Sequence, residues 1–282
     1  MVSVKELKSV ELSSYTIMST AIAVLFSIIV SIIVIIGFGI ISPQTIGASI
    51  YIASTIIVGT LMYSTYNAFC QGFLYNALAK KMNTIKFALK DEKEIVKVST
   101  TETAIIISMI ITIQVILLYL VSVFIVPLLI SSIMQTLMYS GQSELAYALY
   151  QFLMILSQPI TIAMLIFGTF IITFVFILLG CYIYNILANS GRGAVVNLTK
   201  EGNYTAVESV DVLKFAIAFA VIGGILNLIL AIVTLTSGDI TSAIGSIIGG
   251  FIGAFIDGAL LAIFYNFLAP KLGKLKLELI DQ

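Results

Sequence analysis

The chain has no histidine and no tryptophan, only two cysteines, and few charges of either sign. Without histidine it lacks the side chain that most often serves as general base or metal ligand. Charged residues make up 10% of the 282 residues, whereas soluble domains carry about 25%. The 14 lysines and arginines balance 14 aspartates and glutamates, so no net charge attracts nucleic acid. A soluble protein and a nucleic-acid partner are both excluded.

The remaining chemistry is sparse. Cys70 and Cys181 both lie inside apolar stretches, which favours small core residues over a disulfide framework or a CxxC metal or redox site. The sequence contains no HExxH motif, no GxSxG motif and no paired acids within its apolar stretches. We therefore expect no enzyme, no bound metal and no cofactor.

What is present is apolar: 60% of the residues are hydrophobic and the mean hydropathy is +1.14. A helix needs about 20 apolar residues to cross the hydrocarbon core. The first such stretch is too long for the apolar core of a signal peptide, so we interpret it as a retained helix. The sequence predicts a polytopic α-helical membrane protein with six spans, at 15–41, 46–79, 104–129, 160–188, 212–235 and 241–269.

The basic residues predict the orientation. All 14 fall on one side of the six-span arrangement, and the opposite connections at 42–45, 126–159 and 236–240 contain none. By the positive-inside rule both termini are cytoplasmic, and the chain is expected to be a multi-pass protein of the cell membrane. Within the long outer connection, 144–156 predicts a helix that lies at the interface or extends a span; it could instead dock another membrane protein.

The chain repeats itself. Three tails align without gaps: FLYNALAKKMNTIKFALKDE from Phe73, YIYNILANSGRGAVVNLTKE from Tyr182 and IFYNFLAPKLGKLKLELIDQ from Ile263. Each contains Tyr-Asn, at Tyr75-Asn76, Tyr184-Asn185 and Tyr265-Asn266. Apolar residues then alternate with polar ones, which predicts strands at 84–90, 194–200 and 274–280. The lead-ins SVELSSY, KVSTTET and SVDVLKF are also alike.

These alignments predict three repeats, at 1–92, 93–202 and 203–282. Each repeat would contain a short extended segment, a helix, an outer loop, a second helix and a cytoplasmic strand. Because each crosses the membrane twice, the repeats are parallel and predict a pseudo-threefold bundle. Unpaired strand edges leave backbone groups unsatisfied, so we expect the strands to form one sheet or small barrel.

The third copy resembles a family of two-helix transmembrane domains whose function is not known, found in actinobacterial and archaeal membrane proteins. The resemblance covers about 209–281 and rests on Ser209, Lys214, Tyr265-Asn266 and Gly273. The first copy has Asn83 at the position of Gly273, whereas the second copy has glycines at 191 and 193. The whole chain would look like a triplicated form of that domain. The resemblance implies a topology and brings no catalytic residues.

Polar residues near or inside the spans have two interpretations each. The Tyr-Asn pairs stand where the even-numbered spans leave the membrane, where tyrosine favours the interface and asparagine can bind free backbone groups. A structural role is the first interpretation. The second is a ring of three asparagines that forms an inner gate.

Asp257 is the one acid deep in a span, about 13 Å from Asn266 along the helix. Its counterparts in the other copies are Asn67 and Phe176. Such a residue is costly in the membrane and often marks an ion or proton path. The alternatives are a buried, protonated Asp257 bonded to Asn67 or to a backbone carbonyl, and a proton or cation site.

The last span also carries Gly245, Gly249 and Gly253 at four-residue spacing, which predicts a close-packing helix face. We expect this face to pack within the chain rather than in a dimer. Taken together, the sequence favours a non-catalytic membrane subunit or scaffold that contacts the bilayer and other subunits. The alternative is a pseudo-threefold transporter or channel for a small ion or solute that uses Asp257.

Overall fold

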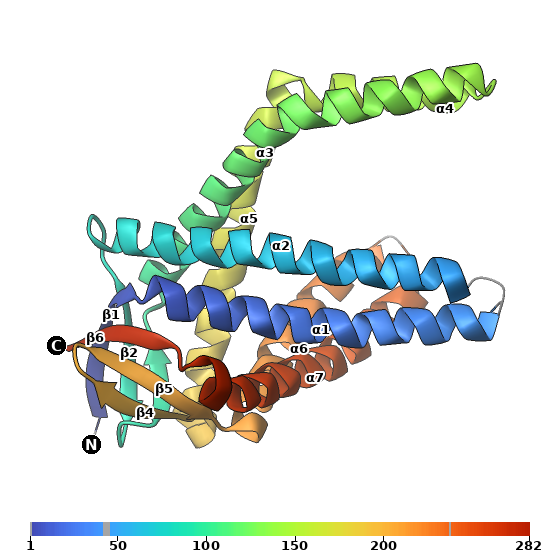
Figure 1. Cartoon of the computed structure of the whole chain (residues 1–282). Coiled ribbons are helices and arrows are strands. Elements are labelled where there is room, and N and C mark those ends of the chain that lie inside the picture. Colours follow the sequence, from blue (N-terminus) through green and yellow to red (C-terminus); the bar gives the residue numbers. More distant parts are fainter. Residues whose placement is uncertain (1, 42–45, 237) are drawn as a thin grey trace. The chain divides into compact units, whose positions relative to one another are not determined.

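The computed structural model describes residues 2–41, 46–236 and 238–282. Six helices in this part of the chain are long and apolar enough to cross a membrane, as the hydropathy predicts. The expected connection at 42–45 lies outside the described residues. The six helices are α1 (Leu12–Ile41), α2 (Ile46–Ala79), α3 (Thr100–Tyr139), α5 (Pro159–Leu187), α6 (Val212–Thr236) and α7 (Ile240–Leu272) (Figure 1).

A small antiparallel sheet adjoins the helices. Its six strands are β1 (Val2–Val10), β2 (Ile85–Lys90), β3 (Glu94–Val98), β4 (Val196–Glu201), β5 (Tyr204–Val210) and β6 (Lys276–Asp281), in the spatial order β3-β2-β1-β6-β5-β4. The first and last strands of the chain pair with each other, with Leu7 opposite Leu279. The sheet therefore joins the two ends of the chain.

The two edge strands of the sheet, β3 and β4, meet at one bridge between Glu94 and Val195. The Ile95 N–H donates to the Ala194 carbonyl and the Val196 N–H to the Lys93 carbonyl, both at 2.9 Å. This contact satisfies backbone groups that an open edge would leave unpaired.

The lead-in segments are full strands. The alternating tails form β2, β4 and β6, as predicted, and the segments before the odd-numbered spans form β1, β3 and β5. An isolated pair of strands is only marginally stable in water. The lead-in strands therefore supply the additional neighbours that the strands of the tails need. Every basic residue lies in this sheet, in its turns or in a helix turn beside it.

The outer connection at 126–159 is mostly helical, which corrects the prediction of a long loop. Helix α3 continues past the expected end of its span, through Pro127, to Tyr139. It is followed by a short turn and by α4 (Ser143–Leu156), which matches the expected helix at 144–156. Proline usually ends or kinks a helix, which explains the sequence-based boundary, and α3 bends along its length (Figure 1).

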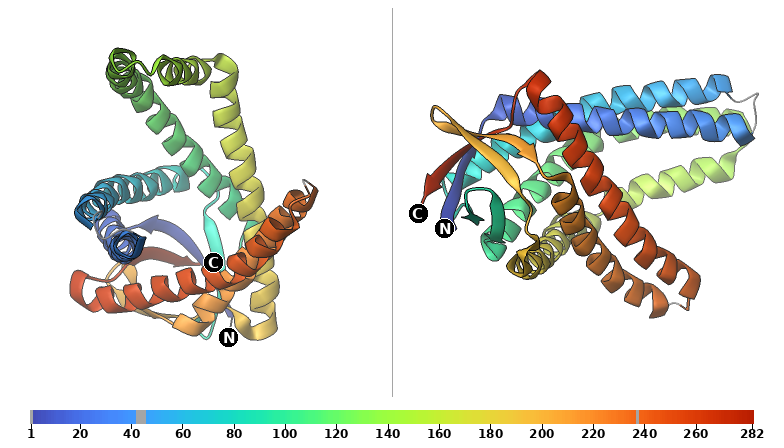
Figure 2. Two further views of the ribbon diagram at one scale, coloured as in Figure 1. Left: turned by 90° about the vertical axis from the view of Figure 1, so that its right-hand side faces the viewer. Right: turned by 90° about the horizontal axis from the view of Figure 1, so that it is seen from below.

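By its contacts the chain divides into two compact units, one formed by the chain up to Ile106 together with Leu178–Gln282, and one by Ile107–Ile177. In the first unit, α1 lies beside α2 and α6 lies beside α7 (Figure 2). A core cluster where α1, α7 and the sheet meet consists of Met18, Val207, Tyr265, Leu268 and Ala269. In the second unit, the Tyr119 hydroxyl of α3 donates to the Leu156 carbonyl of α4 at 3.3 Å.

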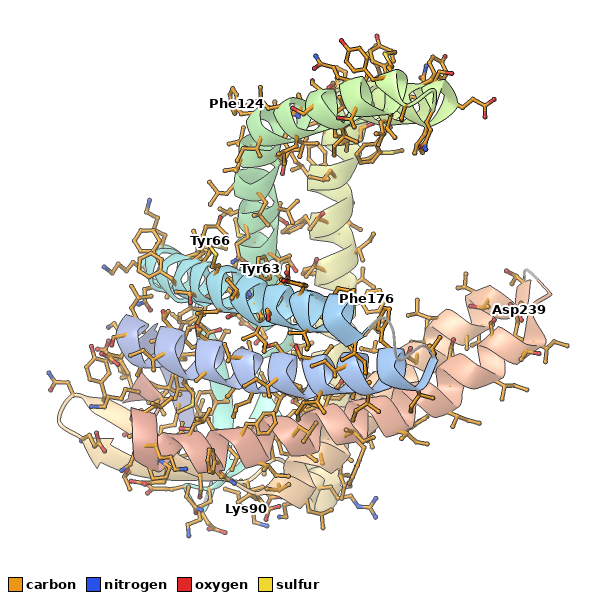
Figure 3. The ribbon with its side chains drawn as sticks, turned by 45° about the vertical axis from the view of Figure 1, so that its right-hand side comes forward. Tyr63, Tyr66, Lys90, Phe124, Phe176 and Asp239 are labelled. Atoms are coloured by element: carbon orange, nitrogen blue, oxygen red, sulfur yellow. The ribbon has the colours of Figure 1, made fainter. Side chains whose placement is uncertain are left out.

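An aspartate caps the end of the α6–α7 hairpin that lies away from the sheet. Figure 3 shows Lys90 at the sheet and Asp239 at the far end of the hairpin. Asp239 caps α7 by accepting a hydrogen bond from the Ser242 N–H at 2.9 Å. A carboxylate at this position stabilises the helix, because its negative charge lies beside the positive end of the helix dipole.

Candidate functional site

The three Tyr-Asn pairs make the same set of hydrogen bonds in three places of the first unit. Each tyrosine hydroxyl donates to a backbone carbonyl of a strand that precedes an odd-numbered span: Tyr75 to Leu7 (2.5 Å), Tyr184 to Ile95 (2.7 Å) and Tyr265 to Val207 (2.5 Å). The hydroxyl also accepts from the N–H ten residues after the tyrosine, at Ile85, Ala194 and Leu275 respectively. One hydroxyl thus bridges two neighbouring strands.

Each asparagine binds both backbone groups of one residue. The Val10 N–H donates to Asn76 Oδ1 and Asn76 Nδ2 donates to the Val10 carbonyl, both at 2.8 Å. Asn185 does the same with Val98, and Asn266 with Val210. These valines are the last residues of β1, β3 and β5, and the sheet pairs each of them on one side only, with Leu277, Phe87 and Val196 respectively. The amide replaces a missing strand neighbour.

We call these three arrangements the Tyr-Asn clamps: Tyr75-Asn76, Tyr184-Asn185 and Tyr265-Asn266 with their bonded strand residues. In every clamp the carbonyl bound by tyrosine lies three residues before the valine bound by asparagine. Each clamp ties the end of an even-numbered span to the strands on either side. Both polar atoms of each amide bind backbone groups, which supports the structural interpretation over an asparagine gate.

A glycine allows the close approach at the bridge between β3 and β4. A Cβ atom at Gly193 would lie 2.4 Å from the Ile95 carbonyl oxygen. Only glycine lets the backbone after α5 come this near to β3. The second clamp is therefore built at a position that tolerates no side chain.

Asp257 lines an apolar pocket of about 410 Å³ between α1, α6 and α7. Six apolar or glycine residues complete the lining: Phe26, Phe219, Ile222, Gly223, Ala254 and Leu261. The Asp257 side chain is exposed, not buried within the chain as one of the two interpretations required. Among the described residues, no hydrogen bond joins it to Asn67.

Asn67 belongs to a different set of contacts. Its Oδ1 accepts a hydrogen bond from Gln71 Nε2 at 3.4 Å, and Gln71 Oε1 accepts one from the Tyr15 hydroxyl at 2.9 Å. Asn67 and Gln71 both lie on α2, and Tyr15 lies on α1. The structure thus places Asn67 in the contact between α1 and α2 and does not bring it to Asp257.

The glycines of α7 fall on two faces, and the prediction chose the wrong one for packing within the chain. A Cβ atom at Gly245, Gly249 or Gly253 would meet no atom within 4 Å. The contact with α6 instead uses Gly250, where a Cβ would lie 2.5 Å from Asn227, and Gly258, where it would lie 2.7 Å from Phe219. Ala254 completes this face, 2.5 Å from a Cβ built at Gly223.

We call these the inner face (Gly250, Ala254, Gly258) and the open face (Gly245, Gly249, Gly253, Asp257) of α7. Both follow the four-residue spacing that places side chains along one side of a helix. The sequence contained the signal for the inner face, because Gly250 and Gly258 are in it. The pairing with Gly223 of α6 could be recognised only after the two helices were brought together.

Ion pairs lie on the sheet and not in the pocket. Lys274 contacts Glu208 and, at 3.2 Å, Glu201, which also contacts Lys276 at 3.2 Å. Hydrogen bonding to Lys274 lowers the pKa of both glutamates and raises the pKa of Lys274 itself. About one third of each of these side chains is exposed to solvent, which screens the charges, so the pairs contribute little to stability.

Comparison with models of protein families, with curated proteins and with solved structures finds no match for this chain. The resemblance of 209–281 to a two-helix transmembrane family stays a prediction.

Proposed function

We propose that this protein is a non-catalytic integral-membrane subunit or scaffold of a larger membrane complex. The observation that carries the proposal is the triple clamp, in which the polar side chains at the ends of three spans are used to hold the sheet. Buried hydrogen-bond networks that are fully satisfied make a rigid framework. Such a framework suits a chain that positions partners.

We further propose that the chain is built from three parallel repeats with pseudo-threefold symmetry. The same pattern of four hydrogen bonds at each clamp supports this organisation. So does the sheet: the first strand of each repeat meets the last strand of the same repeat, as β1–β2, the β3–β4 bridge and β5–β6. The meeting of the edge strands is what a small barrel requires.

The proposed partners are the lipid bilayer and other membrane subunits, and not nucleic acid. In this proposal the sheet and both termini lie in the cytoplasm of a cell-membrane protein. The positions of the basic residues support this orientation, because all of them lie in or beside the sheet.

The experiment that tests this proposal is purification of the tagged chain at native expression in mild detergent, followed by mass spectrometry and native-gel sizing. A membrane complex of fixed stoichiometry is the expected result. Purification of the chain alone, at monomer size, contradicts the subunit role.

A second candidate function is transport of a small ion or solute through Asp257. The specific observation in its favour is that Asp257 lines a pocket. The apolar remainder of the lining opposes it, because an ion path needs successive polar groups. Reconstitution of the purified chain in liposomes decides between the subunit role and transport. Flux that Asp257→Asn abolishes would establish transport. Absence of flux in the wild type would rule transport out.

A further inference from the structure

The open face of α7 is a groove beside a ridge. A Cβ atom built at any of its three glycines would meet no atom of another element within 4 Å. An adjacent row of isoleucines with the same spacing is half exposed: Ile244, Ile248, Ile252 and Ile256. Helices pack by placing the ridge of one into the groove of the other. A glycine groove lets two backbones approach closely, which drives association of transmembrane helices. This shape fits a helix better than it fits a flexible acyl chain.

Asp257 continues the same row, one turn after Gly253. The carboxylate lies within a membrane-crossing helix and has no hydrogen bond or ion pair with any other described residue. Acids at such depth normally pair with a cation or a hydrogen-bond donor, because an isolated charge in the bilayer is costly. The pocket that Asp257 lines has space for a side chain beside the carboxylate.

The partner group must come from another kind of chain. All 14 basic residues of this protein lie in the sheet, its turns or the adjoining helix turns, and the nearest one along α7, Lys271, is about 21 Å from Asp257. Lys214, near the start of α6, already contacts Glu94 at 3.6 Å. A second copy would bring no cation to the depth of Asp257. Charge complementarity thus excludes a homodimer as the partner of this carboxylate.

We propose that the open face of α7 binds a transmembrane helix of a different subunit, which carries a lysine or arginine at the depth of Asp257. The glycine groove receives the helix backbone and the pocket receives the basic side chain. This inference rests on the proposed subunit role and gives the partner a chemical signature.

A defined peptide tests the proposal directly. The full chain in nanodiscs is mixed with a synthetic leucine-alanine transmembrane helix that carries one lysine about 13 Å from its cytoplasmic end. Energy transfer between fluorophores on the two molecules reports binding, and peptides of both orientations are used. One control peptide has leucine in place of lysine; another has the lysine moved to the opposite side of the helix.

The matched protein variants are Asp257→Asn, Gly253→Leu and Gly59→Leu. We expect the lysine peptide to bind about tenfold more tightly than both control peptides, and Asp257→Asn to remove this difference. Gly253→Leu should weaken binding because it fills the groove. Gly59→Leu makes the same substitution on α2, where a Cβ also meets no atom within 4 Å, and should leave binding unchanged.

Several outcomes would overturn the proposal. Equal binding of the lysine and leucine peptides does so, and so does lysine-peptide binding that both Asp257→Asn and Gly253→Leu leave intact. Energy transfer between two copies of the chain that Gly253→Leu abolishes would assign the face to a homodimer. Saturable binding of dodecylamine at Asp257 without peptide binding would assign the pocket to a free amine.

The two proposals fail separately. If a complex co-purifies equally well with wild type and with Gly253→Leu, the docking site is wrong and the subunit role stands. If the wild type purifies alone, the subunit role is wrong whether or not the peptide binds.

Discussion

The two faces of α7 use the same residue type at the same spacing, yet only one of them packs within the chain. On the inner face, Gly250 and Gly258 would clash with α6 if they carried a Cβ atom. On the open face, a Cβ atom at Gly245, Gly249 or Gly253 would meet no atom within 4 Å. The difference teaches that four-residue glycine spacing marks a surface suited to close helix contact and does not say which helix makes the contact.

The largest expected effect is on stability, and it should differ between the two faces when glycine is replaced by leucine. Gly258→Leu should cost about 3 kcal/mol of unfolding free energy or more, because the backbone of α6 at Ala216 lies 3.1 Å from the new Cβ. Gly253→Leu should change stability by no more than about 0.5 kcal/mol. Unfolding in mixed SDS micelles measures both. Equal losses would show that the open face is also packed.

The clamp at the end of the helix gives the next effect. Asn266→Ala should cost about 2 kcal/mol, because both backbone groups of Val210 lose their partner. The matched control is Asn189→Ala, at an exposed asparagine just after α5. The same unfolding measurement applies. If Asn266→Ala lowers the free energy of unfolding as little as Asn189→Ala does, the clamps do not hold the helix ends.

On the open face the sign of the effect should reverse. Asp257→Leu should leave the isolated chain as stable as the wild type or stabilise it by about 1 kcal/mol, since it removes an uncompensated acid from a span. Leu261→Asp, the reverse change at another pocket residue, should destabilise the chain. A loss of stability in Asp257→Leu would indicate a structural role for the carboxylate.

The smallest effect concerns the ion pairs of the sheet, which include no residue of the inner face or the open face of α7. The pKa values of Glu201 and Glu208 are lowered from 4.5. Their contribution is therefore complete above pH 4.5 and is lost as the pH falls through the lowered values. The pKa of Lys274 is raised from 10.5, so its contribution is lost as the pH rises above that value.

Lys274→Met should slightly reduce the loss of unfolding free energy at both low and high pH. Unfolding measured from pH 3 to pH 11, at low and at high salt, would show this change. Lys200→Met is the control, because it lies on the same sheet outside the ion-pair cluster. An identical pH response of the two variants would contradict the assignment to the cluster.

Much of the fold could be predicted from the sequence because its signals are local. Apolar length predicted the six helices, and period-two alternation predicted β2, β4 and β6. The outer end of α3 could not be predicted, because proline usually ends or kinks a helix, whereas Pro127 lies inside this one. The short lead-ins β1, β3 and β5 are strands because they have neighbours to pair with.

The candidate site was predictable in its residues and not in its partners. Asp257 stood out because an acid deep in a span is costly, and one of its two interpretations gave it Asn67 or a backbone carbonyl as a partner. In the structure, Asn67 instead accepts a hydrogen bond from Gln71 of the same helix. A repeat-equivalent position predicts similar placement in each copy, and it does not predict that two copies touch each other.

The sequence by itself determined the six long apolar helices, the alternating strands and the recurrence of Tyr-Asn, since each depends on residues near one another in the chain. Only the tertiary structure decided that each Tyr-Asn pair holds the end of a strand, and that the glycines of α7 divide into a packed and an open face. These contacts join residues far apart in the sequence, and their geometry depends on how two backbones approach. No spacing within a single helix contains that information.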